Sequence, residues 1–192
     1  NLLMKKIYLF DFDGTISKRD SFILFSSFSL SVLILIKFWI TTFLFLFIFP
    51  RQKLKERFFE HFKGLDLHSF QLICNHFYRG KLNKEIKKSF IDYLRVTPSN
   101  SEIVVVSASI SNYLKPFCNE MGFDLISTEL EIKDGKLTGK FSTPNCNGEE
   151  KVRRIKEKYD LSIYNEIHVF GNSKGDLPML ALGTHKYYKF FN

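Results

Sequence analysis

Three short runs of mostly apolar residues recur along the chain, and each ends abruptly at polar residues. The first run, 7–10, stops at Asp11 and Asp13; the second spans 103–106 and the third spans 167–170. A strand that is covered on both faces does not alternate with polar residues, so these runs predict buried strands. Strands that are separated by helical stretches pair in parallel. We therefore predict an α/β fold built on a parallel sheet.

Helical spacing dominates between the first two runs. Residues 54–94 carry apolar side chains three and four positions apart, with a break near 64–66. We predict that 16–95 forms an all-helical cap domain, inserted into a core made of 1–15 and 96–192. Beyond the second strand, the sequence predicts a helix over 111–121, a strand near 125, a hairpin around 134–135, helices from 151 and 177, and a last strand at 187–188.

The stretch 21–50 is unusually apolar, with Lys37 as its only charged residue. As one helix, 22–49 would be about 42 Å long at ~1.5 Å per residue, more than a ~30 Å hydrocarbon core needs. A single membrane span would put Asp11 and Asp13 on the opposite side of the membrane from the residues after position 50, including the polar residues at the ends of the second and third strands. Three alternatives stay open: a buried cap helix, a re-entrant hairpin, or a helix lying in the membrane interface, where Trp39 and the basic residues of 51–55 would suit acidic lipid. The segment could equally be the interface of a homodimer.

Composition narrows the class of partner. The chain has 192 residues and a net charge of +8, which fits an anionic partner such as a phosphorylated metabolite or an acidic membrane surface. No basic and aromatic interleaving and no zinc spacing supports a nucleic-acid module, so we expect no nucleic-acid partner. Three widely spaced cysteines favour reduced thiols in the cytoplasm. We expect a cytoplasmic protein, with peripheral attachment to the inner face of the membrane as the alternative.

Asp11 and Asp13 are the first candidates for chemistry. Successive strand side chains point to opposite faces, so the two acids share a side if the extended geometry persists. Ligands of open α/β sheets bind at the carboxyl ends of the strands. A pair of acids there suits phosphoryl transfer: one carboxylate attacks phosphorus, and the other protonates the leaving oxygen and later takes a proton from water. Mg²⁺ would reduce the repulsion between these acids and a phosphate.

Four polar residues later in the chain fit the same chemistry. Ser107 follows the second strand, Lys151 opens a predicted helix, and Asn172 and Asp176 lie in the loop after the third strand. Parallel strands end on one edge of a sheet, so these residues should meet there. The hydroxyl and the ammonium could hold phosphate oxygens, while Asn172 and Asp176 could supply oxygen ligands or orient a metal's surroundings.

In order and type, these motifs resemble those of the haloacid dehalogenase superfamily of phosphohydrolases, over nearly the whole chain. Residues 11–15 look like motif one, Ser107 like motif two, Lys151 like motif three and 171–176 like motif four. A helical insert directly after motif one is similar to the phosphoserine phosphatase-like branch, subfamily IB, with its helical C1 cap. The resemblance implies a Rossmann-like core that the cap covers.

The resemblance also implies a role for each matched position. Asp11 would be the nucleophile that forms an aspartyl-phosphate, and Asp13 would be the general acid and base. Ser107 and Lys151 would bind the phosphoryl group and stabilise its developing charge. The implied function is a Mg²⁺-dependent phosphomonoester hydrolase that acts on a small phosphorylated metabolite.

The implied metal site departs from the family in one residue. Mg²⁺ would be held by Asp11, the Asp13 carbonyl, Asn172 and Asp176. Many family members carry Asp where this chain has Asn172, so the site has lost one negative charge. An amide oxygen still coordinates metal ions, and Asp176 remains, so we expect weaker Mg²⁺ binding and an active site.

Two alternatives to a small metabolite remain at this stage. The apolar stretch 21–50 and the residues 146–152 also look like the bacterial phosphatidylglycerophosphatase C type, which acts on a lipid phosphate. An apolar cap near the site would suit such a substrate. The alternative from another class is a non-catalytic domain that binds a phosphorylated ligand or a membrane while keeping the fold.

Overall fold

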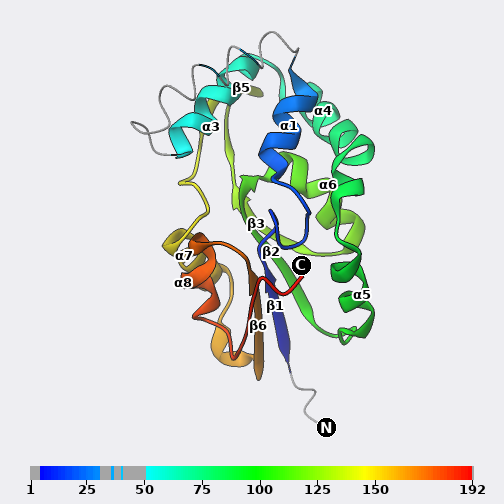
Figure 1. Cartoon of the computed structure of the whole chain (residues 1–192). Helices are drawn as coiled ribbons and strands as arrows, with labels where there is room; N and C mark the ends of the chain where they lie inside the picture. Colours follow the sequence, from blue (N-terminus) through cyan, green and yellow to red (C-terminus); the bar gives the residue numbers. More distant parts are fainter. Residues whose placement is uncertain (1–4, 31–35, 37–39, 41–50, 192) are drawn as a thin grey trace.

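A five-stranded parallel sheet forms the centre of the computed structural model, which describes residues 5–30, 36, 40 and 51–191 (Figure 1). Its strand order is β3-β2-β1-β6-β7. The strands are β1 (Lys6–Phe10), β2 (Glu102–Ile110), β3 (Asp124–Thr128), β6 (Glu166–Gly171) and β7 (His185–Tyr188). The expected parallel α/β sheet is thus confirmed.

Helices cover both faces of this sheet. Along β1, Tyr8 and Phe10 point into one apolar core while Ile7 and Leu9 point into another, as the period of two requires. The helices α5 (Lys88–Val96) and α6 (Ser111–Met121) lie on the first face, and α7 (Glu149–Lys158) and α8 (Leu177–Leu180) lie on the second (Figure 1). The apolar runs of the sequence are therefore buried on both sides.

The described part of the insert between β1 and β2 is helical, as the sequence predicts. It contains α1 (Ser21–Ser29), α3 (Arg51–Phe59), η1 (Glu60–Phe62), α4 (Leu67–Gly80), η2 (Leu82–Glu85) and α5. The division of the chain at residue 95 stays a prediction. The last of these helices packs on the sheet, because the Phe90 ring lies 5.2 Å from the Phe10 ring of β1 in an edge-to-face arrangement. This packing argues for a cap that ends before α5.

The long apolar stretch does not continue as one helix from Phe22. The first helix ends at Ser29, and Leu30 is extended with φ −115° and ψ 149°. The hydroxyls of Ser26, Ser27 and Ser29 each donate to a carbonyl three or four residues earlier, where they compete with the helix's own pattern. Most of the stretch beyond Leu30 lies outside the described residues. Among the helices that are described, none is long and apolar enough to cross a membrane.

An antiparallel hairpin joins the cap to the core. It pairs β4 (Leu130–Lys133) with β5 (Lys136–Phe141), as the Asp134-Gly135 signal predicts. The amide of Gly64 donates to Leu137 O at 2.8 Å, and the amide of Leu137 donates to Leu65 O at 2.9 Å. A Cβ on Gly139 would lie 2.8 Å from Glu60 Cα, so only glycine fits where the hairpin meets η1.

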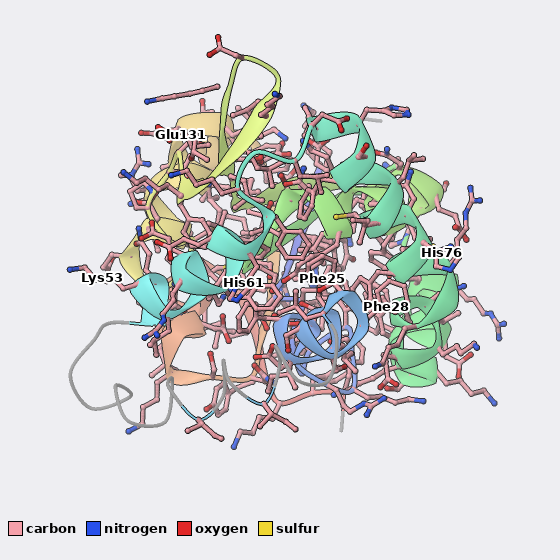
Figure 2. All side chains as sticks on the ribbon, turned by 90° about the horizontal axis from the view of Figure 1, so that it is seen from above. Phe25, Phe28, Lys53, His61, His76 and Glu131 are labelled. Carbon is pink, nitrogen blue, oxygen red and sulfur yellow. The ribbon has the colours of Figure 1, made fainter. Side chains whose placement is uncertain are left out.

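Aromatic rings fill the interior of the cap, and Phe25 of α1 lies among them. Its side chain is completely buried, with the ring 5.1 Å from Tyr113 and 5.2 Å from Phe77. Figure 2 shows Phe25 in the interior, whereas Lys53, His76 and Glu131 lie toward the periphery. The first third of the apolar stretch is therefore the core of the cap.

We expect Phe25→Ala to lower the free energy of unfolding by about 3–5 kcal/mol, because the truncation leaves a cavity among rigid rings. Urea unfolding measures the change. Ile23→Ala is the matched control on the same helix, because that side chain is 52% exposed, and it should cost less than about 1 kcal/mol. Equal losses in the two variants would contradict the burial of this helix.

Candidate active site

A buried lysine joins two acids at the carboxyl edge of the sheet. The Lys151 ammonium donates to Asp11 Oδ1 at 2.6 Å and to Asp176 Oδ1 at 2.7 Å. The lysine side chain is only 1% exposed, and both carboxylates are buried with it. Three residues that the sequence singled out thus meet although they lie far apart along the chain.

Short loops from three elements bring these groups together. Asp11 directly follows β1, and its amide still donates to Phe170 O at 2.9 Å, which extends the pairing with β6. Lys151 lies in the first turn of α7, and the amide of Gly148 just before this helix donates to Gly175 O at 3.0 Å. This bond ties the helix that carries the lysine to the loop that carries Asp176.

The second oxygen of Asp176 organises its own loop. It accepts hydrogen bonds from the amides of Asn172 and Ser173 at 3.1 and 2.9 Å, and from the Ser173 hydroxyl at 2.7 Å. A Cβ on Gly171 would lie 2.5 Å from Asp176 Cβ, so the loop folds back this tightly only over a glycine. The carboxylate thus contacts Lys151 through one oxygen and its own loop through the other. Its assignment as a metal ligand stays a prediction.

The ion cluster shifts the pKa of each member. Burial raises the pKa of Asp11 to about 6, against the opposing pull of the Lys151 ammonium, so the carboxyl is mostly ionised at pH 7. Burial disfavours the charged lysine, but the two carboxylates outweigh it and raise the pKa of Lys151. Asp176 is also desolvated, yet the ammonium beside it lowers its pKa. At neutral pH the cluster is an ionised carboxylate pair with one cation between.

Asp13 is separated from Asp11 by a turn and has different partners. The amides of Thr15, Ile16 and Ser17 all donate to Phe12 O, at 3.2, 2.9 and 3.0 Å, so the extended geometry ends before Asp13. Asp11 and Asp13 therefore do not share one face of a strand, because that expectation required the extended geometry to persist as far as Asp13. Burial, with the charge of Asp20 second, raises the pKa of Asp13. Its own charge in turn raises the pKa of Asp11, because the two carboxyls still interact.

Ser107 and Asn172 lie beside the first motif. Ser107 lies on β2 two residues beyond Val105, which pairs with Phe10 of β1, and its hydroxyl accepts the amide of Ser109 at 3.1 Å. A Cβ on Gly14 would lie 1.9 Å from Asn172 Nδ2, so the Asn172 amide rests directly on the Asp13-Gly14 turn. Gly14 also has φ +78°, a conformation that glycine adopts without strain.

The donors at this edge fit a divalent metal ion with a preference for oxygen. The Asp11 carboxylate, the Asp13 carbonyl and the Asn172 amide oxygen are donors of the kind that hard cations favour. The Lys151 ammonium contacts two carboxylates, those of Asp11 and Asp176, whereas the Asp13 carboxyl is bound by Ser109 and Ser21. A divalent cation would offset the negative charge that one ammonium leaves on the pair. The metal itself stays a prediction.

The sequence did not single out three hydroxyl residues that contact the acids. Thr15 Oγ1 donates to Asp11 Oδ2 at 3.1 Å. Ser109 Oγ donates to Asp13 Oδ2 at 2.7 Å, and the amide of Ser21 donates to Asp13 Oδ1 at 2.7 Å. Thr15 closes motif one and Ser109 lies two residues after Ser107, so their contacts with the acids could have been suspected. Ser21 belongs to the cap, and no local pattern connects it to Asp13.

A second cluster of titratable groups lies at the other end of the sheet. Glu166, His168 and His185 place their possible ligand atoms within 4.8 Å of one another. The two imidazole rings are stacked, with centroids 4.4 Å apart and planes only 8° from parallel. Because a ring nitrogen binds a metal in the plane of its ring, parallel stacked rings cannot direct their lone pairs to one ion. The arrangement is a packed side-chain row on the sheet.

The chain belongs to the haloacid dehalogenase-like hydrolase family, whose sequence model matches residues 8–181. This finding confirms the resemblance that the four motifs indicate. Protein CicA of Caulobacter vibrioides (strain NA1000 / CB15N) is 29% identical over 194 residues, covering 95% of this chain and 85% of CicA.

Solved structures share the fold. A protein with unknown function from Bordetella pertussis Tohama I has a TM-score of 0.85 at 19% identity, covering 95% of this chain and 88% of that one. A phospho-aspartyl intermediate analogue of a phosphoserine phosphatase has a TM-score of 0.64 at 17% identity, covering 96% and 86% of the two chains. The fold is thus phosphoserine phosphatase-like.

Lys151→Met should destabilise the protein by about 3–5 kcal/mol at pH 7, because it leaves buried carboxylates without their cation. In the wild type, Asp176 has a lower pKa in the folded than in the unfolded chain, where it is about 4. Its ionised form therefore stabilises the fold above about pH 4, and this stabilisation is lost as the pH falls through the folded pKa. In the variant, burial raises the pKa of both carboxyls, so stability falls as the pH rises. The difference between the proteins should be larger at pH 7 than at pH 5.

Urea unfolding in the presence of EDTA at the two pH values measures this difference. Lys158→Met is the matched control, because Lys158 pairs with Asp124 at 3.1 Å on the surface, where ion pairs contribute at most about 1 kcal/mol. A loss for Lys151→Met that is independent of pH, or as small as the control's, would contradict the buried ion cluster.

Proposed function

We propose that this chain is a phosphomonoester hydrolase that works through an aspartyl-phosphate on Asp11. The observation that carries the proposal is the Lys151 ammonium, 2.6 Å from a buried Asp11 at the end of the central strand. A solvated acid at a strand end needs no buried cation, whereas a nucleophile that must approach a phosphate anion is helped by one. Membership of a hydrolase family and a phosphoserine phosphatase-like fold support the same chemistry.

In the first step, an oxygen of the Asp11 carboxylate attacks phosphorus and the ester P–O bond breaks. The electron pair of that bond goes to the leaving oxygen, which takes the proton of the Asp13 carboxyl. The raised pKa of Asp13 keeps that proton available closer to neutral pH than an ordinary aspartic acid would. Lys151 and Ser107 hold the phosphoryl oxygens and offset their negative charge.

In the second step, a water molecule attacks the phosphorus of the aspartyl-phosphate. Asp13, now ionised, takes a proton from that water, and the bond between phosphorus and the Asp11 oxygen breaks. Inorganic phosphate leaves, and Asp11 returns to its carboxylate form. Each acid ends the cycle in the state in which it began, so no further reactant is needed.

Mg²⁺ would be held by Asp11, the carbonyl of Asp13 and Asn172, and when bound it would screen the phosphate charge from the carboxylates. Asp176 would orient Lys151 through Oδ1 and hold its own loop through Oδ2.

A small phosphorylated metabolite is the proposed substrate class, in line with the phosphoserine phosphatase-like cap. A lipid phosphate is the second candidate, and one observation favours it. Ile23, Ile36 and Ile40 of the apolar stretch are 52%, 51% and 59% exposed, so described residues of this stretch offer apolar surface to a membrane. The proposed membrane contact rests on these residues. The homodimer and the absence of a nucleic-acid partner stay predictions.

Purified protein should release phosphate from at least one phosphomonoester in a Mg²⁺-dependent manner. The panel contains phosphoserine, sugar phosphates, nucleotides and phosphatidylglycerophosphate in vesicles, each with Mg²⁺ and with EDTA. Asp11→Asn should lose at least ~1,000-fold in rate, because the amide is not a nucleophile. Asp92→Asn is the matched control and should keep full activity, since Asp92 is exposed on α5.

The outcome of the panel separates the candidates. Release that is confined to the vesicles supports the lipid candidate, and preference for a soluble ester supports the metabolite. If the wild type releases nothing from any substrate, or if Asp11→Asn is as fast as the wild type, the hydrolase proposal fails in favour of a non-catalytic phospho-ligand-binding domain.

Asp13→Asn should retain the first step in part and slow the second, because the amide cannot take a proton from water. We expect a fall in turnover of about 100-fold or more, with ³²P from a labelled substrate remaining on the protein in an acid-stable, hydroxylamine-labile form. Wild-type turnover in this variant would remove Asp13 from the acid/base role.

A further inference from the structure

Both oxygens of the Asp13 carboxylate have hydrogen-bond partners outside the first motif. Ser109 Oγ, at the end of β2, donates to Oδ2 at 2.7 Å. The amide of Ser21, the first residue of the cap helix α1, donates to Oδ1 at 2.7 Å. The carboxylate is therefore held from the core on one side and from the cap on the other.

A buried group of hydroxyls supports the Ser109 contact. Ser21 Oγ lies 2.9 Å from Ser109 Oγ, and the Tyr113 hydroxyl of α6 lies 3.5 Å from Ser21 Oγ. All three residues are buried, at most 1% exposed. The amide of Ser109 donates to Ser107 Oγ, which further fixes the loop after β2. If the single proton of Ser109 goes to Asp13, the Ser21 hydroxyl must be the donor in its contact with Ser109 Oγ.

Such rigidity matters for a group that must deliver a proton. A general acid works only when its oxygen lies within hydrogen-bond reach of the atom it protonates, and small displacements cost large factors in rate. Each carboxylate oxygen has room for two hydrogen bonds, so the bonds from Ser109 and Ser21 leave a place for the ester oxygen. A carboxyl without them could rotate about its side-chain bonds.

We propose that Ser109 is a positioning residue that holds the Asp13 carboxyl in line with the leaving oxygen, with Ser21 supporting it from the cap. The inference rests on the proposed hydrolase function, in which the Asp13 proton moves to the oxygen released from phosphorus. Ser109 touches Asp13 and acts on the substrate only through it.

The test compares two leaving groups of nearly the same size. Phenolate is a strong base that needs a proton as it leaves, whereas p-nitrophenolate is a weak base that departs without one. Ser109→Ala should lower the single-turnover rate of phenol release from phenyl phosphate by about 10- to 100-fold, part of the 10²- to 10⁴-fold that general acid catalysis supplies. Release of p-nitrophenol should fall by less than about threefold, and KM should not change for either ester.

Three variants accompany this measurement. Ser109→Thr keeps the hydroxyl and should recover most of the phenyl phosphate rate. Ser21→Ala keeps the amide bond to Asp13 and loses only its hydroxyl, so it should have a smaller effect of the same kind. Ser26→Ala is the control, because Ser26 is a fully buried serine of the same helix whose hydroxyl bonds only within that helix, to Ile23 O at 2.8 Å. It should change neither rate.

The outcomes separate this inference from the function on which it rests. Suppose that wild-type hydrolysis depends on Asp11 but that Ser109→Ala lowers the rate equally for both esters. Ser109 would then have only a structural role. A faster release of phenol in that variant would mean that the bond holds Asp13 away from the substrate; both results overturn the inference alone. A wild type that hydrolyses neither these esters nor any substrate of the panel removes the proposed function and this inference together.

Discussion

A buried ammonium shared by two carboxylates is the interaction on which the rest of the structure depends. Burying an unpaired charge costs several kcal/mol per ion, so Lys151 is tolerable inside the protein only where Asp11 and Asp176 both reach it. These residues come from the end of β1, the start of α7 and the loop after β6. They converge because β1 and β6 are neighbours and parallel, so their carboxyl ends share one edge. The order of the strands in the sheet is thus a condition for a stable site.

This convergence could be predicted from the sequence because it follows from simple rules. An apolar run of four residues predicts a buried strand, parallel strands end on one edge, and a polar residue directly after such a strand lies at that edge. Asp11 and Asp176 were placed in this way, and the position of Lys151 at the start of a helix followed from the motif order. The rules use only local pattern and topology.

What the sequence could not predict depends on contacts between distant segments. The end of α1 at Ser29 reflects serine hydroxyls that bond to carbonyls within the helix, and hydrophobicity alone does not reveal this. The partners of Asp13 depend on where the cap helix begins relative to β2, which no local pattern fixes. The chain also turns after Phe12, so Asp11 and Asp13 do not share the strand face that an extended backbone would have given them. Departures from the simple rules concentrate where cap and core meet.

The same boundary explains why Asp13 is held from two sides. The insert reaches the catalytic loops at several points: Lys55 of α3 donates to Ala108 O at 2.9 Å, and Lys87 donates to Gly14 O at 2.7 Å. Ser21 adds the amide bond to Asp13 itself. A movement of α1 away from the sheet would break that last bond and leave Asp13 with its partner on β2. Because Ser109 belongs to the core, its own bond to Asp13 does not pass through α1.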